Sequence, residues 1–291
     1  MIFPTKTPKR INVLAAMQSN GRGHISHPSD GRYGWRQTCR YGPPMIDPID
    51  PRGNTIPTNH LDVAGSMWPC IAEELYRRGA GWNMWWNTAL GNTSMSEDWW
   101  GYSGGLVAQG APGWDPNNYL IAARDHSLLG DYDERWWWIG EGSADASLSR
   151  TLKEMTDLYV LLAQYALSQG ATGVILCCSS HYEGGPNVNF MEEVVSPARA
   201  DALTILASEP RVHAGWDIAG TYGRRWNYHD VIDDTSSAID TGSTAHWAIY
   251  GYEICINLAL EALGPNGAGW YTTPHTRWTF AGSGRTPPAL P

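Results

Sequence analysis

The feature that most constrains the fold is a series of five short apolar segments that alternate with stretches of helical periodicity. Each apolar segment ends in glycine or polar residues, as expected of buried strands. The predicted strands cover 12–17, 82–90, 135–139, 174–178 and 212–218. The predicted helices cover 67–78, 117–129, 151–169, 196–208 and 247–263. Strands that alternate with helices in this way predict a mainly parallel sheet with helices on both faces.

The length of 291 residues and the hydrophobic content of 42% allow one large domain or two modest ones. We predict one domain at 1–271. It contains a Gly/Pro-rich loop at 21–65 without sustained periodicity, and a loop of that length inside a compact domain is usually functional or bound to a partner. Residues 272–291 are also rich in Pro and Gly and predict an extended arm.

The charge balance excludes several classes of protein. There are 20 Lys and Arg against 29 Asp and Glu, so the chain lacks the basic face of a dedicated nucleic-acid binder. No apolar run is long enough to span a membrane. The N-terminal segment MIFPTKTPKR is not followed by the apolar stretch of a signal peptide, so we expect a cytoplasmic protein or one carried on a larger particle such as a virion.

Tryptophan is unusually frequent, with 16 Trp and 14 Tyr against three Phe. Aromatic rings with a polar edge suit amphipathic ligands such as sugars, whose C–H faces stack on them. The same residues could instead fill a core that lacks Phe, and we favour this interpretation for most of them.

Polar residues of a suggestive kind follow the first three predicted strands and precede the last predicted helix. They are Gln18-Ser19-Asn20, Gly91-Asn92-Thr93, Gly140-Glu141, and Asp240 with His246. A hydroxyl nucleophile, an imidazole base and separate donors for an oxyanion are the parts that acyl transfer needs. In a parallel sheet these residues would meet beyond the carboxyl ends of the strands. Each alone is a weak signal, because a Ser after a strand is usually a turn or cap residue.

Four segments resemble, in the same order, the motif blocks of the SGNH hydrolases, in the carbohydrate esterase branch that includes acetylxylan esterases and sialate O-acetylesterases. Residues 16–23 resemble the GQSN-x-x-GRG block, and 88–94 with Trp99 resemble A-x-G-G-T-S…W. Residues 138–145 resemble W-x-Q-G-E-S-D, and 246–252 resemble H-x-x-x-x-G-[YF]. The matched blocks span most of the chain.

The resemblance implies a three-layer α/β/α fold with a five-stranded, mainly parallel, flavodoxin-like sheet. It also implies removal of O-acetyl groups from a carbohydrate through an acetyl-enzyme. In that reaction Ser19 would be the nucleophile and His246 the general base, with the backbone N–H groups of Ser19 and Gly91 in the oxyanion hole. Glu141 would occupy the third block, where relatives place Asn or Glu.

Three positions depart from the family pattern. Met17 and Ile139 replace the usual Gly and Gln, and Ser243 stands where the family has the Asp that precedes the histidine by three residues. The carboxylate that orients His246 is therefore open. We predict Asp240, because 241–245 are small residues that include a glycine and can fold back. Glu141 is the competitor, and a Ser-His pair without a carboxylate is the third alternative.

We expect six residues beside these blocks to contact the substrate: Gln18, Asn20, Arg22, Asn92, Trp99 and Trp100. Trp99 and Trp100 follow the second block and are predicted to line a carbohydrate groove. Trp136, Trp137 and Trp138 lie inside a strand and are predicted to alternate between its two buried faces.

No cofactor and no metal are expected. The chain has no GxGxxG or P-loop motif, so a nucleotide is not indicated. Two groups could seed a metal site: His24 and His27 with Asp30, or Asp47 and Asp50 with Asn54. The first has only two close nitrogens, and the second lies among prolines without the bidentate Glu of a calcium loop.

A rival hypothesis keeps the fold without the catalysis. The chain could be a glycan-binding or receptor-binding component of a larger surface or virion assembly. The long loop and the C-terminal arm could then contact a second copy or another partner. An acetylated carbohydrate is the expected substrate in the enzymatic reading. The sequence does not determine which sugar is bound or which position is acetylated.

Overall fold

The computed structural model describes residues 9–17, 25–26, 64–65, 67–87, 94–101, 132–140, 142–179, 189–222, 249–274 and 276–278. A five-stranded sheet has the order β4-β1-β5-β6-β7, and all neighbouring strands in it are parallel. Its strands are β1 (Arg10–Ala16), β4 (Trp82–Asn87), β5 (Glu134–Ile139), β6 (Gly173–Cys178) and β7 (Val212–Asp217). The five predicted strands and the flavodoxin-like order are confirmed.

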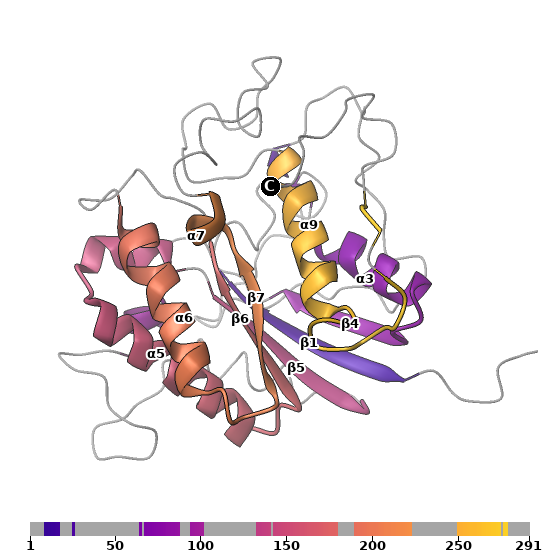
Figure 1. Ribbon diagram of the computed structural model, residues 1–291, viewed down its shortest axis with the longest axis horizontal. Coiled ribbons are helices and arrows are strands. Elements are labelled where there is room, and N and C mark those ends of the chain that lie inside the picture. Colours follow the sequence, from indigo (N-terminus) through magenta and orange to yellow (C-terminus); the bar gives the residue numbers. More distant parts are fainter. Residues whose placement is uncertain are drawn as a thin grey trace, which may run out of the picture.

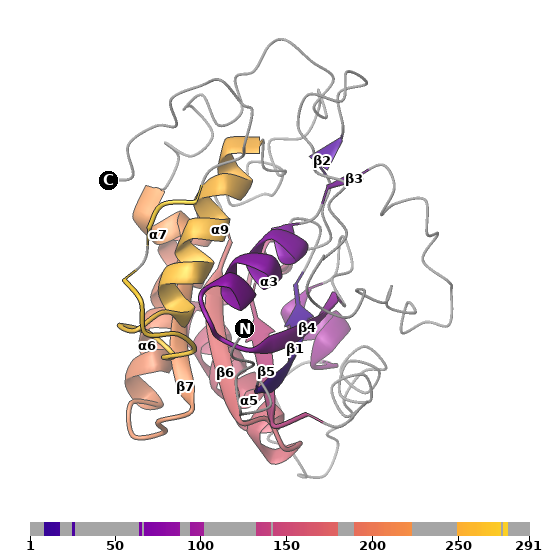
Figure 2. The same ribbon diagram turned by 90° about the vertical axis from the view of Figure 1, so that its right-hand side faces the viewer.

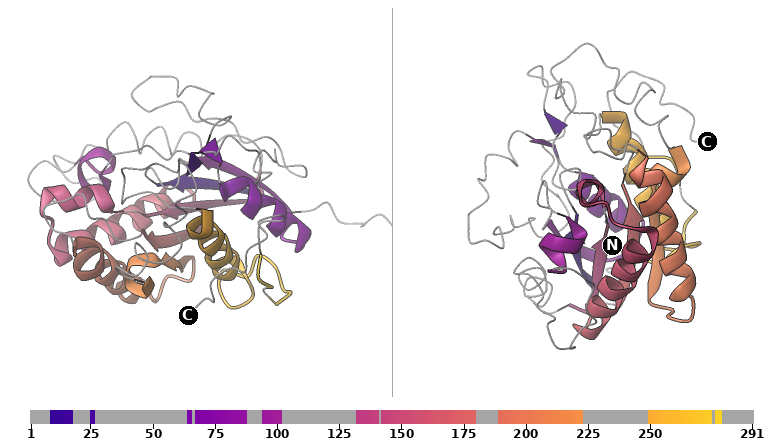
Figure 3. Two further views of the ribbon diagram at one scale, coloured as in Figure 1. Left: turned by 90° about the horizontal axis from the view of Figure 1, so that it is seen from above. Right: turned by 90° about the vertical axis from the view of Figure 1, so that its left-hand side faces the viewer.

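Helices cover both faces of this sheet (Figures 1 and 3). On one face α3 (Met67–Arg77) packs against α9 (Ile249–Leu263), and on the other α5 (Leu152–Ser168) packs against α6 (Ser196–Ile205). The change of face follows from the strand order, because right-handed connections that run in opposite directions from the centre of a sheet must cross on opposite faces. The three-layer α/β/α architecture is therefore confirmed. Among the described helices, none combines the length and the apolar character needed to cross a membrane.

Alternation along the strands divides the buried residues between two cores. Trp136 and Trp138 face α3 and α9, whereas Trp137 and Ile139 face α5 and α6. The predicted alternation of the three consecutive tryptophans is confirmed. All four side chains are buried because a parallel sheet with helices on both sides leaves neither face of its central strands in water.

Tryptophan fills the core on the α3–α9 face. The rings of Trp68 and Trp85 are stacked with their centroids 5.0 Å apart, and Trp138 and Trp216 are also 5.0 Å apart. Trp68 joins the two pairs through Trp216 at 6.1 Å. Large aromatic side chains bury much apolar surface at a small cost in rotamer entropy, so they replace the Phe residues that the chain lacks.

The helix ends follow the predicted signals. Thr151 and Glu154 form a reciprocal capping box at the start of α5, and Gly170 closes the helix with a φ of +90°. The last helix ends at Leu263, directly before Gly264 and Pro265. The predicted helix at 117–129 lies outside the described residues.

The predicted start of a helix at Ser196 and Pro197 is confirmed by the bounds of α6, but further helical structure precedes it. Ser196 and Pro197 were expected to open a helix, but the π-helix η3 (Met191–Val195) runs directly into α6. The buried residues Met191, Val195, Ala198 and Ala202 continue a single apolar face through the junction. This burial extends the helix before the proline, although Pro favours a first turn.

The ends of the long Gly/Pro-rich loop are joined. β2 (Ile25–Ser26) pairs with β3 (Ala64–Gly65) in antiparallel fashion, a contact that the lack of periodicity did not predict. The β2–β3 pair, the short helix α7 (Ile218–Tyr222) and the first turn of α9 lie toward the same end of the molecule (Figure 2).

The first residues of the predicted C-terminal arm are held on the domain. Asn257 of α9 donates from Nδ2 to the carbonyl oxygen of Trp278 at 2.9 Å and accepts from its N–H at 2.7 Å. Arg78, directly after α3, donates to the carbonyl oxygen of Thr276 at 3.0 Å, and its guanidinium lies over the ring of Tyr271. The arm is therefore anchored on α3 and α9 at least as far as Trp278.

The end of β5 is tied closely to both of its neighbours at Gly140. Its N–H donates to the carbonyl oxygen of Ala16 at 3.2 Å, its φ is +138°, and a Cβ there would collide with the carbonyl oxygen of Cys177. A side chain at this position would therefore meet both an unfavourable backbone conformation and fixed main-chain atoms.

We predict that Gly140→Ala lowers the free energy of unfolding by at least about 3 kcal/mol, because strain and overpacking add. Gly170→Ala is the matched control: its φ is +90°, but no atom lies within 4 Å of the added Cβ. It should cost only about 1 to 2 kcal/mol. Denaturant unfolding of both variants measures the difference, and equal losses would contradict the packing argument.

Candidate functional site

Three strand ends that precede the predicted motif blocks are adjacent in the sheet. Ala15 of β1 is in register with Asn87 of β4 on one side and with Trp138 of β5 on the other. The first block begins at Ala16, the last residue of β1, and the third block begins at Trp138 inside β5 and continues through Gly140. The sheet order therefore brings the starting points of all three blocks to one carboxyl edge.

Ser19, Gly91 and Glu141 follow these strand ends in the sequence, and Asp240 and His246 precede α9. Ser19, Gly91, Glu141, Asp240 and His246 lie outside the described residues, and so do Gln18, Asn20, Arg22 and Asn92. Their roles stay predictions. A chain advances at most about 3.6 Å per residue, so the short spacing of Ser19, Gly91 and Glu141 from their strand ends limits how far each can lie from this edge.

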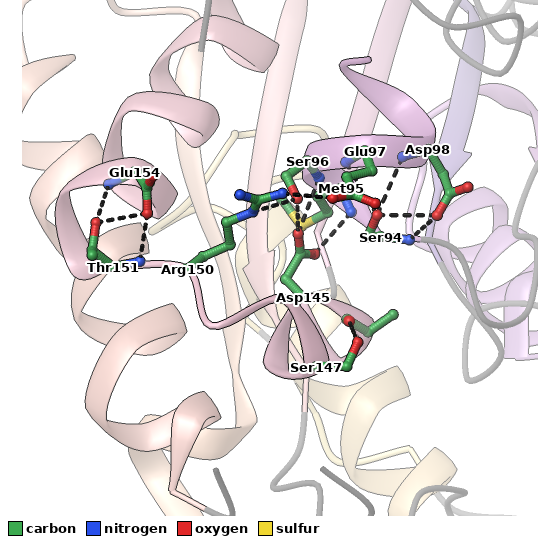
Figure 4. Close-up of polar contacts among 11 residues, drawn as sticks. Ser94, Met95, Ser96, Glu97, Asp98, Asp145, Ser147, Arg150, Thr151 and Glu154 are labelled. Atoms are coloured by element: carbon green, nitrogen blue, oxygen red, sulfur yellow. Dashed lines mark hydrogen bonds and ion pairs between the residues drawn. The ribbon is translucent and has the colours of Figure 1, made fainter. Parts of the chain in front are cut away.

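The described part of this edge contains a buried carboxylate that the sequence analysis did not single out. Asp145 lies in the short 3-10 helix η2 (Ser143–Leu148) and is 0% exposed. Its carboxylate accepts from the N–H of Met95 at 2.8 Å, from the N–H of Ser96 at 3.1 Å and from the Ser96 hydroxyl at 2.5 Å (Figure 4). These donors belong to the π-helix η1 (Met95–Trp99), which follows the second motif block.

Ser94 forms the other end of this polar cluster. Its Oγ accepts from the N–H groups of Glu97 and Asp98, while its own N–H and hydroxyl donate to the Asp98 carboxylate at 2.7 and 3.0 Å. This reciprocal cap fixes the entry of the chain into η1, directly after Gly91-Asn92-Thr93.

Arg150 closes the cluster from the side of η2. Its Nε donates to Ser96 Oγ at 3.2 Å, and its Nη2 donates to Glu97 Oε1 at 2.9 Å (Figure 4). Ser149, the residue before it, has a φ of +52°, a backbone conformation that residues other than Gly and Asn rarely adopt. The Ser96 hydroxyl therefore accepts a hydrogen bond from Arg150 and donates one to Asp145.

Burial dominates the electrostatics of Asp145. Removal from water raises its pKa from 3.8 to about 6, against the hydrogen bonds from Ser96 and Met95 and the charge of Arg150, which lower the pKa. A carboxylate that accepts three hydrogen bonds at the predicted active edge could serve to hold two segments together. Its full burial leaves it no access to a ligand from solvent.

The sequence contained only half of the signal for this cluster. Asp145 was visible inside the third motif block, but its donors Met95 and Ser96 lie about fifty residues earlier. No local pattern connects a buried carboxylate with donors at that separation. Only the packing of η1 on η2 does so.

The prediction that Trp99 and Trp100 line a carbohydrate groove is wrong. Trp99 is 0% exposed and Trp100 2% exposed, and both lie in the core on the α5–α6 face. Trp100 packs edge-on against Tyr165 of α5 with ring centroids 6.1 Å apart. Once η1 folds against α5, the apolar area of these rings is worth more in the core than at a surface.

The two thiols of β6 are unsuited to nucleophilic catalysis. Cys177 and Cys178 are buried on opposite faces of β6, and burial raises the pKa of both thiols. Cys177 and Cys178 are buried free thiols, as their position in an apolar segment predicted. Within the described ranges, no three His, Cys, Asp or Glu side chains gather closely enough to hold a metal ion.

Comparisons with known proteins give structural neighbours only. No protein-family profile and no curated protein sequence matches the chain. A family two carbohydrate esterase from Clostridium thermocellum, solved in complex with cellohexaose, is 14% identical with a TM-score of 0.42 over 93% of this chain and 67% of its own. A protein from Arabidopsis thaliana is 17% identical with a TM-score of 0.36, over 72% of this chain and 85% of its own.

The raised pKa of Asp145 predicts a pH dependence of stability. Between pH 3.8 and about 6 the folded protein keeps this proton while the unfolded chain has lost it. The stabilising contribution is therefore complete below pH 3.8 and is lost as the pH rises through about 6. We expect the free energy of unfolding, relative to that of Asp145→Asn, to fall by about 2 kcal/mol between pH 4 and pH 7.

Denaturant unfolding of the wild type and of Asp145→Asn at a series of pH values measures this difference. Exposed Asp157, which pairs with Lys153 on the surface of α5, supplies the control Asp157→Asn. A constant difference between wild type and Asp145→Asn across this range would contradict the prediction.

Proposed function

We propose that this protein is a serine esterase that removes O-acetyl groups from a carbohydrate. The observation that carries the proposal is the register of β1 between β4 and β5. It supports a common edge for three sequence blocks that resemble those of carbohydrate esterases. In open α/β sheets, active sites lie at such an edge, where the strand order reverses.

The proposed reaction has two steps. Ser19 Oγ attacks the acetyl carbonyl while His246 takes its proton, and backbone N–H groups of Ser19 and Gly91 stabilise the oxyanion. The tetrahedral intermediate collapses to an acetyl-enzyme, and His246 returns the proton to the departing sugar oxygen. Water activated by His246 then releases acetate and restores the Ser19 hydroxyl.

The rival binding function gains no support from the tryptophans whose side chains the structure describes. It relied on tryptophans presented to a glycan. Every tryptophan whose side chain the structure describes is buried, except half-buried Trp278. The described tryptophans therefore do not favour glycan binding, whereas the motif blocks favour the enzymatic proposal.

We predict that a fluorophosphonate probe attaches once, at Ser19, and that His246→Ala abolishes labelling because the hydroxyl then lacks its base. Ser19→Ala should reduce acetate release from p-nitrophenyl acetate and from acetylated polysaccharide by several orders of magnitude. The control is Ser208→Ala, which removes an exposed hydroxyl beyond α6 and should change neither signal. Labelling at another serine, or acetate release without labelling, would reject the assignment.

We also predict that Asp240 orients His246. Asp240→Asn should lower kcat by about 10⁴-fold while the fold stays intact, because the imidazole then takes the wrong tautomer. Glu141→Gln is the matched variant for the competing carboxylate. A kcat near that of the wild type in Asp240→Asn, together with a collapse in Glu141→Gln, would transfer the role to Glu141. Near-normal kcat in both variants would indicate a Ser-His pair.

A further inference from the structure

The Asp145 cluster connects two segments that belong to different motif blocks. Met95 and Ser96 begin η1, which follows the block at Gly91 after β4. Asp145 lies in η2, which follows the block at Glu141 after β5. Two of the three bonds to the carboxylate come from main-chain N–H groups, so they fix the path of the backbone itself.

The bonds are strong because the cluster is buried. Asp145 has no exposed surface, and Met95 and Ser96 are buried beside it. Hydrogen bonds to a charged acceptor in a low-dielectric interior are shorter and stronger than neutral ones. An unmet donor there costs the full desolvation of the group, so loss of the carboxylate would favour separation of the two segments.

We propose that Asp145 is a positioning residue that holds the segment after β4 against the segment after β5, and so sets the spacing between the predicted oxyanion donor Gly91 and the third motif block. This inference rests on the proposed esterase function. Asp145 acts through the backbone of Met95 and Ser96 and does not itself touch the substrate. Arg150 supports it by holding Ser96 in the orientation that donates to Asp145.

The charged residues near Asp145 determine how the Asp145 cluster responds to pH. Among the described charged side chains, Arg150 is the one whose charge shifts the pKa of Asp145, and it lowers that pKa. Glu97 binds Arg150, Asp98 binds Ser94, and Glu154 binds Thr151 at the start of α5. The ionised carboxylate matches its three donors, whereas protonation adds a fourth hydrogen among them. Protonation of Asp145 should therefore lower the activity, in addition to the loss that protonation of His246 causes.

The test compares kcat–pH profiles on p-nitrophenyl acetate. Asp145→Asn should lower kcat about 100-fold with little change in KM, because a displacement of about 1 Å has that effect on catalysis. Ser96→Ala removes a single hydroxyl and a bond that lowers the pKa of Asp145, so the acidic limb of the profile should move to higher pH. Arg150→Gln should move it in the same direction. A residue that serves only for stability would leave the limb in place.

Arg211→Gln is the matched control, since Arg211 forms an exposed ion pair with Glu209 far along the chain from the cluster. It should leave the profile unchanged. Hydrogen exchange of the 94–97 segment gives a second measurement that needs no catalysis. Exchange there should accelerate in Asp145→Asn, while exchange in α5 stays as in the wild type.

The outcomes separate the two proposals. An active wild type whose acidic limb stays in place in Ser96→Ala and Arg150→Gln rejects the positioning role alone. Unchanged exchange of 94–97 in Asp145→Asn also rejects it. If the wild type neither releases acetate nor is labelled at Ser19, the proposed esterase function is rejected. The positioning role of Asp145 in catalysis is then rejected with it. If Asp145→Asn does not fold, Ser96→Ala decides.

Discussion

The pairing of β1 with β4 on one side and β5 on the other is the interaction on which the rest of the structure depends. It places the first strand of the chain inside the sheet, so the connections to its two neighbours leave in opposite directions. α3 must then cover one face, whereas α5 covers the other. The strand ends on either side of this reversal form the crevice edge at which α/β proteins bind their ligands.

Each face of this sheet is covered by its own cluster of buried apolar side chains. One core contains tryptophans from α3, β4, β5 and β7 in mutual contact, and the other contains aliphatic and aromatic residues of α5, α6 and η1. Such large rings leave little room for adjustment at strand contacts. Gly173 shows this, since a Cβ there would collide with the ring of Trp136. Packing of this density holds the strand ends in fixed register.

Several polar side chains of this molecule fix the path of loops. Asp145 binds the backbone of η1, and Asp217 at the end of β7 accepts from Ser196 Oγ at 2.7 Å and from the N–H of Gly220 at 2.9 Å. Arg199 donates to the carbonyl oxygens of Leu176 and Gly215 near the same edge. A buried polar group gains little net stability but tolerates few alternative geometries, so it specifies the path of a loop.

The sequence by itself determined the strands, most helices and the alternation of Trp136–Trp138, because periodicity and capping residues act over a few neighbours. The order of the strands was an expectation from the family resemblance. It also marked Ser19, Gly91, Glu141 and His246 as candidate catalytic residues. These four lie outside the described residues, so their roles stay predictions. Only the tertiary structure decided that η3 extends α6, that Trp99 and Trp100 are core residues, and that Asp145 joins two motif blocks. Those outcomes depend on burial and on contacts between residues far apart in the chain, and local patterns contain no information about either.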